Sequence, residues 1–189
     1  MTARYRPHLL GIDDGPFDKN TDTRVPVVGV MTEGADLVEA VAVTDFPVDG
    51  NDAADFLAEW VGGLRFAAAL HAVVLGGITL AGLAVVDLEH LVRRLRKPVL
   101  AVNRQPPEDE PLIRALRSAG LNDRVAIVER SPRAWKLSDG LFVAHAGAQR
   151  REAERLLRAT LHKSQLPEPL RLAHLVGAAV ARGESHGRP

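Results

Sequence analysis

The chain of 189 residues contains no cysteine. Disulfides, thiolate nucleophiles and zinc–thiolate sites are therefore excluded. Aromatic residues are also rare at 4%, too few for the stacking platform of a single-strand-binding protein. No hydrophobic run approaches the roughly 20 residues of a membrane-spanning helix, and residues 1–8 are too short and polar for a secretion signal. We therefore expect a cytoplasmic protein without a membrane segment.

The chain also lacks the glycine-rich loops that bind nucleotide phosphates. Gly76-Gly77 followed by Gly82 does not have the spacing of the dinucleotide fingerprint, and no phosphate-loop lysine follows a glycine run. The common nucleotide-dependent enzyme classes are therefore not indicated.

What is present is an ordinary globular composition, with 46% hydrophobic and 25% charged residues. This length supports one domain with its own core. Linkers, low-complexity segments and internal repeats are not evident. We expect a single domain over residues 1–189, in which the polar tail 183–189 frays.

The net charge of zero hides an asymmetry between the two halves of the chain. Residues 1–90 carry 14 Asp and Glu against 5 Lys and Arg, whereas residues 91–189 carry 10 against 19. The basic half could follow a phosphate backbone. Equally, the two halves could pack with complementary charge, since charge blocks are usually solvated faces. The candidate nucleic-acid-binding residues are Arg150, Arg151, Arg155 and Arg171.

The stretch from Leu9 to Phe17 reads as a buried strand that Gly15-Pro16 brings to an end. Side chains alternate along a strand, so Asp14 should share a face with Leu10 and Ile12, while Asp13 takes the opposite face. A carboxylate at the end of a buried strand is costly without a cation or hydrogen bonds. The pair therefore favours a divalent-metal site, although either aspartate alone is better explained as a turn residue.

Apolar periodicity predicts the remaining elements. Short bounded runs predict strands at 25–30, 37–46, 72–75, 98–102, 125–128 and 141–144. Helical spacing predicts helices at 53–62, 88–96, 108–119, 149–162 and 170–181. Early strands joined by short turns form an antiparallel meander, and later strands that alternate with helices require parallel crossovers. The expected fold is an α/β domain with a mixed sheet and helices on both faces.

Several aspartates sit at strand ends, loop turns or helix starts: Asp13, Asp14, Asp49, Asp52 and Asp87. Hard oxygen ligands of this kind suit Mg²⁺ or Mn²⁺, and two such ions can clamp the attacking and leaving oxygens of a phosphodiester. Each aspartate taken alone is better explained as a cap or turn residue. Asp52 and Asp87 precede predicted helices, where aspartate is a common N-cap.

The last predicted helix carries Glu168, Arg171 and His174 at a spacing of three, close to one face. A histidine there could be a general acid or a metal ligand. It could also be a core histidine bound to a backbone carbonyl, and that alternative is favoured for the residue alone. Glu168 could equally serve as a charge partner of the helix dipole.

Taken together, colinear segments of the chain carry a family likeness: GIDDGPF, PVVGV, VDGNDA, LGGITLAGLAVVDL, KPVLAV, LPEPLRLAHL and GESHGR. They resemble the mostly archaeal endonuclease dU family, a relative of endonuclease V. The resemblance implies a ribonuclease H-like fold and a Mg²⁺- or Mn²⁺-dependent cut in DNA near a deaminated base. It implies catalytic roles for Asp13, Asp52 and His174, with Asp49 the alternative to Asp52. Together with the strand-end carboxylates, this makes Asp13, Asp14, Asp49 and Asp52 the candidate metal ligands.

The resemblance also implies a pocket for an extruded base, which we expect to be lined by Gly76, Gly77, Ile78, Thr79 and Gly82. The chain departs from the family in this region. The family usually reads Asp-Gly-Ile-Thr where this chain has Gly76 to Thr79, and endonuclease V has a lysine where this chain has Asn103. An alternative function is therefore a nucleic-acid-binding member whose catalysis is weakened or lost.

Overall fold

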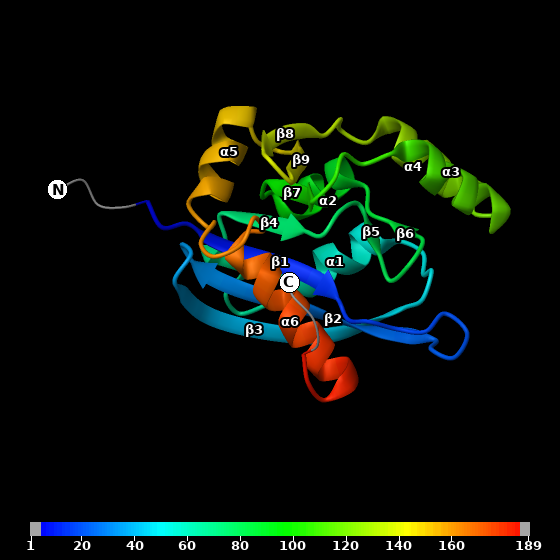
Figure 1. The fold of residues 1–189 in the computed structure, drawn as a ribbon, viewed down its shortest axis with the longest axis horizontal. Coiled ribbons are helices and arrows are strands. Elements are labelled where there is room, and N and C mark those ends of the chain that lie inside the picture. Colours follow the sequence, from blue (N-terminus) through cyan, green and yellow to red (C-terminus); the bar gives the residue numbers. More distant parts are fainter. Residues whose placement is uncertain (1–4, 186–189) are drawn as a thin grey trace.

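The first strand and its neighbours form the centre of the molecule (Figure 1). The computed structural model describes residues 5–185. The strands are β1 His8–Asp14, β2 Arg24–Glu33, β3 Leu37–Pro47, β4 Ala72–Leu75, β5 Thr79–Leu80, β6 Ala84–Val85, β7 Val99–Asn103, β8 Trp135–Ser138 and β9 Leu141–Ala146. The helices are α1 Ala53–Gly62, α2 Leu88–Leu95, α3 Asp109–Ser118, α4 Asn122–Arg130, α5 Arg150–Arg158 and α6 Glu168–Arg182, with a short 3₁₀ turn at Ala67–Ala69.

The main sheet has seven strands in the order β3-β2-β1-β4-β7-β9-β8. The meander β1-β2-β3 is antiparallel, and β4 pairs parallel to both β1 and β7. The mixed sheet expected from the sequence is therefore confirmed. Its far edge differs from the expectation, because β9 and β8 return antiparallel.

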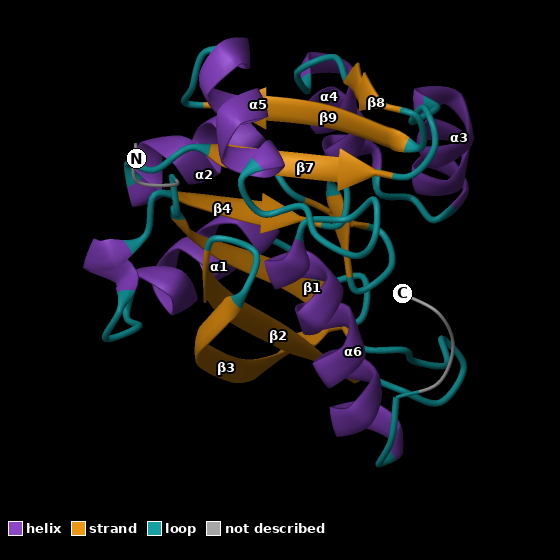
Figure 2. Ribbon diagram, turned by 60° about the vertical axis from the view of Figure 1, so that its left-hand side comes forward, coloured by secondary structure: helices purple, strands orange, loops and turns teal. Residues whose placement is uncertain are grey.

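Helices cover both faces of this sheet (Figure 2). One core cluster joins Leu10 and Ile12 of β1 to α1 and α2, with Leu57 and Leu91 fully buried. A second cluster on the other face joins Leu9 to α5 and to the start of α6. The two faces of β1 therefore alternate as expected, with every second side chain buried against a different helical layer.

Gly11 allows α6 to lie directly on β1. A Cβ added at Gly11 would overlap the backbone of Pro169 and Leu170. Further along, Gly15 and Gly177 approach each other in the same way. Glycine is needed where two backbones come this close, and this contact sets the position of α6 across β1 and β2 (Figure 1).

Four details of the structure differ from the predicted elements. Residues 125–128 are not a strand but part of α4, where Val125 and Val128 pack with Leu116 of α3. The small hairpin β5–β6, between Ile78 and Val86, was not predicted. The strand β8, which pairs with β9, was not predicted, and α5 ends at Arg158 rather than at residue 162.

The C-terminal part of the described chain ends with α6. Gly183 follows it in the left-handed conformation, with φ 84°. Residues 186–189 of the expected fraying tail lie outside the described residues. Among residues 5–185, none of the helices has the length and apolar character needed to cross a membrane.

Candidate active site

Asp13 and His174 meet at the C-terminal end of β1. The His174 Nδ1 atom lies 2.9 Å from Asp13 Oδ2, although 161 residues separate the two in the chain. Asp13 faces α6 because it alternates with Ile12, and Gly11 brings α6 close enough for contact. The Asp13 side chain is 19% exposed and that of His174 is 49% exposed. A carboxylate and an imidazole are thus held together in a position that solvent or a substrate can reach.

The charge of Asp13 affects the titration of His174. The hydrogen bond to Asp13 and the negative charge of that carboxylate raise the pKa of His174, against opposing contributions from burial and from Arg104. The protonated imidazole is therefore favoured, with Nδ1 donating to Asp13. Nε2 is then the ring nitrogen that can reach a substrate.

Asp14 lies on the opposite face of β1, as the strand alternation predicted. Its Oδ2 atom accepts a hydrogen bond of 2.8 Å from the Ala81 backbone N–H. Burial raises the pKa of Asp14, and the neighbouring charge of Asp13 raises it further. Asp14 therefore fixes the loop after β4 through this hydrogen bond. Its raised pKa means that, without a cation nearby, its carboxylate ionises less readily than an ordinary aspartate.

Gly76, at the end of β4, faces Asp13. A Cβ added at Gly76 would lie 3.1 Å from Asp13 Oδ1, and the backbone of Gly76 does not adopt positive φ. A side chain at this position would therefore point directly at the Asp13 carboxylate. The aspartate that the resemblance implies at this position would therefore lie beside Asp13.

A cavity of about 610 Å³ opens beside this position. Gly76, Gly77, Ile78 and Thr79 line it, together with Asn103 and Phe142. These are four of the five residues expected to form a base pocket. The fifth residue, Gly82, is not among the lining residues. It lies against Asp49, whose Oδ1 atom occupies the space of a Cβ.

Asp49 holds the loop between β5 and β6. Its Oδ1 atom accepts a hydrogen bond of 2.6 Å from the Leu83 backbone N–H, two residues beyond the amide that Asp14 binds. Arg124 is only 3% exposed and donates to the carbonyl oxygens of Leu83 and Asp49. Asp49 therefore helps to hold this loop in place, and one oxygen of its carboxylate is already bound to a backbone N–H.

Asp52 and Asp87 line a different cavity of about 410 Å³, together with Asp55 and Arg130. Asp52 precedes α1 with φ 54°, and its side chain makes no capping hydrogen bond. Asp87 caps α2 by accepting from the His90 N–H, as expected, and also pairs with Arg130 at 2.8 Å. The structure brings Asp13, His174 and Gly76 together, whereas Asp14 points to the opposite face of β1 and Asp52 has separate surroundings.

A compact group of metal ligands is not found around Asp13 within residues 5–185. The three potential ligands whose atoms all lie within 4.8 Å of one another are His8, Glu33 and Glu39, at the other end of β1. The five aspartates singled out from the sequence do not meet that distance criterion. A cation at Asp13 would therefore be bound by fewer protein side chains than the sequence predicted.

The arginines expected to bind nucleic acid have other partners. Arg171 makes a bidentate ion pair with the buried carboxylate of Glu168, with Nη2 at 2.8 Å from Oε2. Arg150 stacks over Trp135, and Arg155 stacks over Tyr5, which precedes β1 and so lies at the end away from Asp13. Arg151 is exposed on α5. Unlike these four arginines, Arg104 has a charge that acts on the site, since it lowers the pKa of His174.

The sequence reasoning missed Arg104, Arg124 and the backbone amide of Ala81. Arg104 follows directly after β7, and the ends of neighbouring parallel strands meet at one edge of a sheet. Its place directly after a predicted strand could therefore have identified Arg104 from the sequence. Arg124 lies in the segment wrongly predicted as a strand, which hid its role.

Comparison with known proteins identifies relatives of this chain. Residues 6–181 match the family described as Endonuclease dU. A UPF0215 protein of Archaeoglobus fulgidus is 37% identical over 181 residues, covering 95% of this chain and 97% of that protein. The crystal structure of a protein of unknown function from the same organism matches with a TM-score of 0.85 and 36% identity, covering 96% of this chain and 99% of that one.

A more distant structural match shows the fold alone. Endonuclease V of Ciona intestinalis, in complex with a 24mer DNA containing an inosine followed by a ribo-adenosine, matches with a TM-score of 0.55 at 13% identity. The match covers 92% of this chain and 84% of that one. The resemblance drawn from the sequence motifs and the ribonuclease H-like fold are both confirmed.

Proposed function

Because the chain belongs to the endonuclease dU family, a nuclease family with the fold of endonuclease V, we propose that it is a metal-dependent endonuclease. Its substrate is DNA that contains a deaminated base, either uracil or hypoxanthine, and its role is DNA repair. The observation that carries the proposal is the contact between Asp13 and His174, beside Gly76 and an adjoining cavity.

The residues around Asp13 fit a hard divalent cation. Mg²⁺ usually keeps several waters and is bound by one or two carboxylates together with substrate phosphate oxygens. Asp13 supplies one such carboxylate, and water and substrate phosphate oxygens would complete the shell, because Asp14 points to the opposite face of β1. Bound there, Mg²⁺ or Mn²⁺ would polarise the scissile phosphate and activate the attacking water.

His174 has two roles in this proposal. Its Nδ1–H bond to Asp13 orients that carboxylate, as the outer partners of metal ligands generally do. Its exposed ring then presents Nε2 to the substrate, where a protonated imidazole can donate to the departing oxygen. Without a bound cation, the Asp13 carboxylate raises the pKa of His174 and so favours the protonated, donating form of the ring.

The cavity beside Gly76 is the proposed site for an extruded base. Its volume of about 610 Å³ exceeds what a single base needs, and Thr79, Asn103 and Phe142 offer two polar groups and an aromatic ring. These are the groups that proteins use to bind the edge and the face of a base. The endonuclease V of Ciona was crystallised with inosine-containing DNA, which supports a deaminated base as the ligand of this cavity.

The direct test is a nicking assay on matched duplexes that differ in one base. Strands with one uracil, one hypoxanthine or only normal bases are incubated with stoichiometric protein in Mg²⁺, Mn²⁺ or EDTA. We expect nicking of a damaged strand in metal, with none in EDTA and none by Asp13→Asn. The exposed variant Glu110→Gln on α3 is the control and should nick like the parent. Absence of nicking of every duplex in both metals would refute the proposal.

A second candidate function is favoured by Gly76, which leaves Asp13 without the neighbouring carboxylate that the family carries. In that case the chain binds nucleic acid but cuts it weakly or not at all. Binding would then persist in EDTA and would weaken steeply with salt, because phosphate contacts release counterions. Tighter binding on addition of Mg²⁺ would argue for the enzyme instead.

A further inference from the structure

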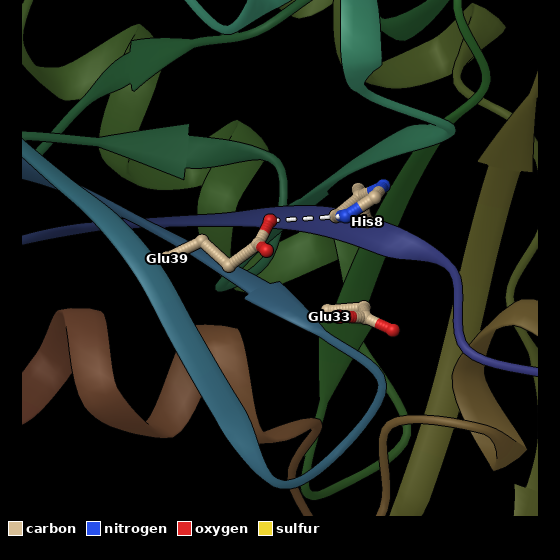
Figure 3. A group of neighbouring side chains, drawn as sticks. All are labelled: His8, Glu33 and Glu39. Carbon is tan, nitrogen blue, oxygen red and sulfur yellow. Dashed lines mark ion pairs between the residues drawn. The ribbon is translucent and has the colours of Figure 1, made fainter.

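We propose that His8, Glu33 and Glu39 form a second metal site, for a transition-metal ion of the Zn²⁺ class, at the N-terminal end of β1. Figure 3 shows the three side chains on neighbouring strands, with the ion pair between Glu39 and His8 drawn as a dashed line. This proposal does not depend on the nuclease activity, since none of these residues belongs to the Asp13 site.

The distances between the ligand atoms suit a single ion. One ligand atom from each of the three residues lies within 4.8 Å of the other two. His8 Nε2 and Glu39 Oε2 are 3.0 Å apart. Two ligands on one tetrahedral Zn²⁺, at about 2.0–2.2 Å from the metal, are roughly 3.3–3.6 Å apart. Small rotations of Glu33 and Glu39 would therefore complete a site of one nitrogen and two oxygens, with a fourth position left for water.

The strand register brings His8 and Glu33 together. His8 of β1 pairs directly with Glu33 of the antiparallel strand β2, so their side chains lie on the same face. That face is the one that carries Leu10 and Met31, both in the core beneath α1. Two of the three ligands are therefore fixed by backbone pairing alone.

A β-bulge supplies the third ligand. Ala40 pairs with Met31 and Val38 pairs with Thr32, so Glu39 is an extra residue in β3. In a regular strand Glu39 would point to the face opposite Ala40, which packs on the α1 side. The bulge instead lets Glu39 reach His8 on the α1 side. Bulges redirect side chains in this way and are frequent beside functional sites.

The surroundings hold the ligands in place and favour a cation. Arg6 Nε donates to Glu33 Oε1 at 3.0 Å, which leaves Oε2 to face an ion. The same guanidinium bonds Asp36 at 3.1 Å. The His8 backbone N–H donates to His71 Nδ1, and the two imidazole rings stack at 5.6 Å. Arg6 pairs with two carboxylates, Glu33 and Asp36, and the Glu39 carboxylate beside them adds negative charge that a divalent ion would offset.

The donor types decide which ion fits. Imidazole nitrogen suits Zn²⁺, Cu²⁺, Fe²⁺ and Ni²⁺, whereas Mg²⁺ prefers oxygen ligands alone. Side chains that are 27% exposed for His8 and 31% exposed for both glutamates leave a path for the ion. A bound Zn²⁺ would connect three strands and so stabilise the β2–β3 hairpin against opening.

The test measures Zn²⁺ binding and thermal stability on the chelator-treated full chain. Zn²⁺ titrated by calorimetry should bind at a single strong site and raise the melting temperature. Glu33→Gln and Glu39→Gln keep side-chain size and hydrogen bonding, and each should lower the affinity at least about tenfold while melting like the parent in EDTA. The matched control Glu110→Gln and the variant Asp13→Asn should bind Zn²⁺ as the parent does.

Anomalous scattering at the zinc edge then places the ion. Density between His8, Glu33 and Glu39 is the expected result. Unchanged Zn²⁺ affinity in both glutamine variants, or loss of binding in Asp13→Asn, would overturn the proposal. Failure of the nicking assay would leave this result unaffected, so the two proposals can fail separately.

Discussion

The two ends of β1 each carry a contact between a histidine and a carboxylate, but they are built differently. At the C-terminal end, the adjacent Asp13 and Asp14 point to opposite faces, and the histidine comes from a helix late in the chain. At the N-terminal end, His8, Glu33 and Glu39 come from three paired strands and share one face. The ends lie about 17 Å apart, at roughly 3.4 Å for each residue of strand.

This difference shows how a sheet and a helix position charged groups. Strand pairing brings side chains together in a fixed register, so the N-terminal cluster follows from β1–β3 alone. The C-terminal contact requires α6 to lie on Gly11, and its second carboxylate is turned away to bind the loop after β4. The first arrangement gathers a histidine and two carboxylates on one face, while the second leaves the Asp13 carboxylate beside a histidine and partly open to solvent.

The largest effect is expected at the C-terminal end. Replacing His174 by glutamine keeps an amide that can hydrogen-bond Asp13 but removes the protonated ring. Nicking of damaged duplex should fall at least about 100-fold, the usual contribution of a general acid. Single-turnover rates in Mg²⁺ measure this, with Glu110→Gln as the control. A rate within a factor of a few of the parent would exclude His174 as the proton donor.

The next largest effect is expected on folding stability, from a substitution where α6 packs on β1. Gly11→Ala would force the backbone of Pro169 and Leu170 away from β1, and overpacking of this kind costs about 1–3 kcal/mol or more. Urea unfolding should show this loss. Gly62→Ala, where an added Cβ meets open space, should be neutral or stabilising by up to about 1 kcal/mol. Equal stability of the two variants would contradict the close contact.

Gly76→Asp tests whether the missing carboxylate distinguishes this chain from its family. The new side chain would lie beside Asp13 Oδ1, so the variant should be less stable than the parent in EDTA because of like-charge repulsion. Added Mg²⁺ should restore its stability and increase nicking together, since a ligand stabilises the state that binds it. Thermal melts in EDTA and in Mg²⁺ measure the change. Identical melting in both conditions would show that residue 76 does not join the Asp13 site.

The smallest effect concerns His145, which lies away from both ends of β1. Burial and the charge of Arg150 lower the pKa of His145, whose Nδ1 accepts from Trp135 Nε1 at 3.0 Å. A histidine whose pKa is lower in the folded chain than in the unfolded chain, where it is about 6.5, stabilises the fold at pH values above about 6.5. That stabilisation is lost as the pH falls through the folded pKa. Unfolding at pH 7.5 and 5.5, followed by Trp fluorescence, should show the parent weakening more than His145→Asn. Equal weakening of parent and variant would contradict this assignment.

Much of the fold could be predicted because it rests on local pattern. The alternation in β1 placed Asp14 with Ile12 and Asp13 on the other face, and the structure agrees. The segment 125–128 failed because a short apolar run does not distinguish a strand from a buried helix. Leu121, Val125 and Val128 repeat at helical spacing, but only a longer window makes that visible.

The candidate sites were harder to predict because they depend on pairing between distant segments. Asp52 was expected at the Asp13 site, yet it precedes α1 in a left-handed conformation and lines another cavity. Glu39 was not singled out at all, since its position follows from a bulge between Met31 and Thr32. Neither the bulge nor the convergence of carboxylates has a signature in a single sequence.

The separation of 161 residues between Asp13 and His174 has a consequence for how the protein is made. A ribosome releases β1, β2 and β3 early, so the N-terminal cluster can assemble while synthesis continues. The partner of Asp13 emerges only with α6, after every strand of the sheet has been made. A nascent chain that ends before α6 would therefore lack this contact.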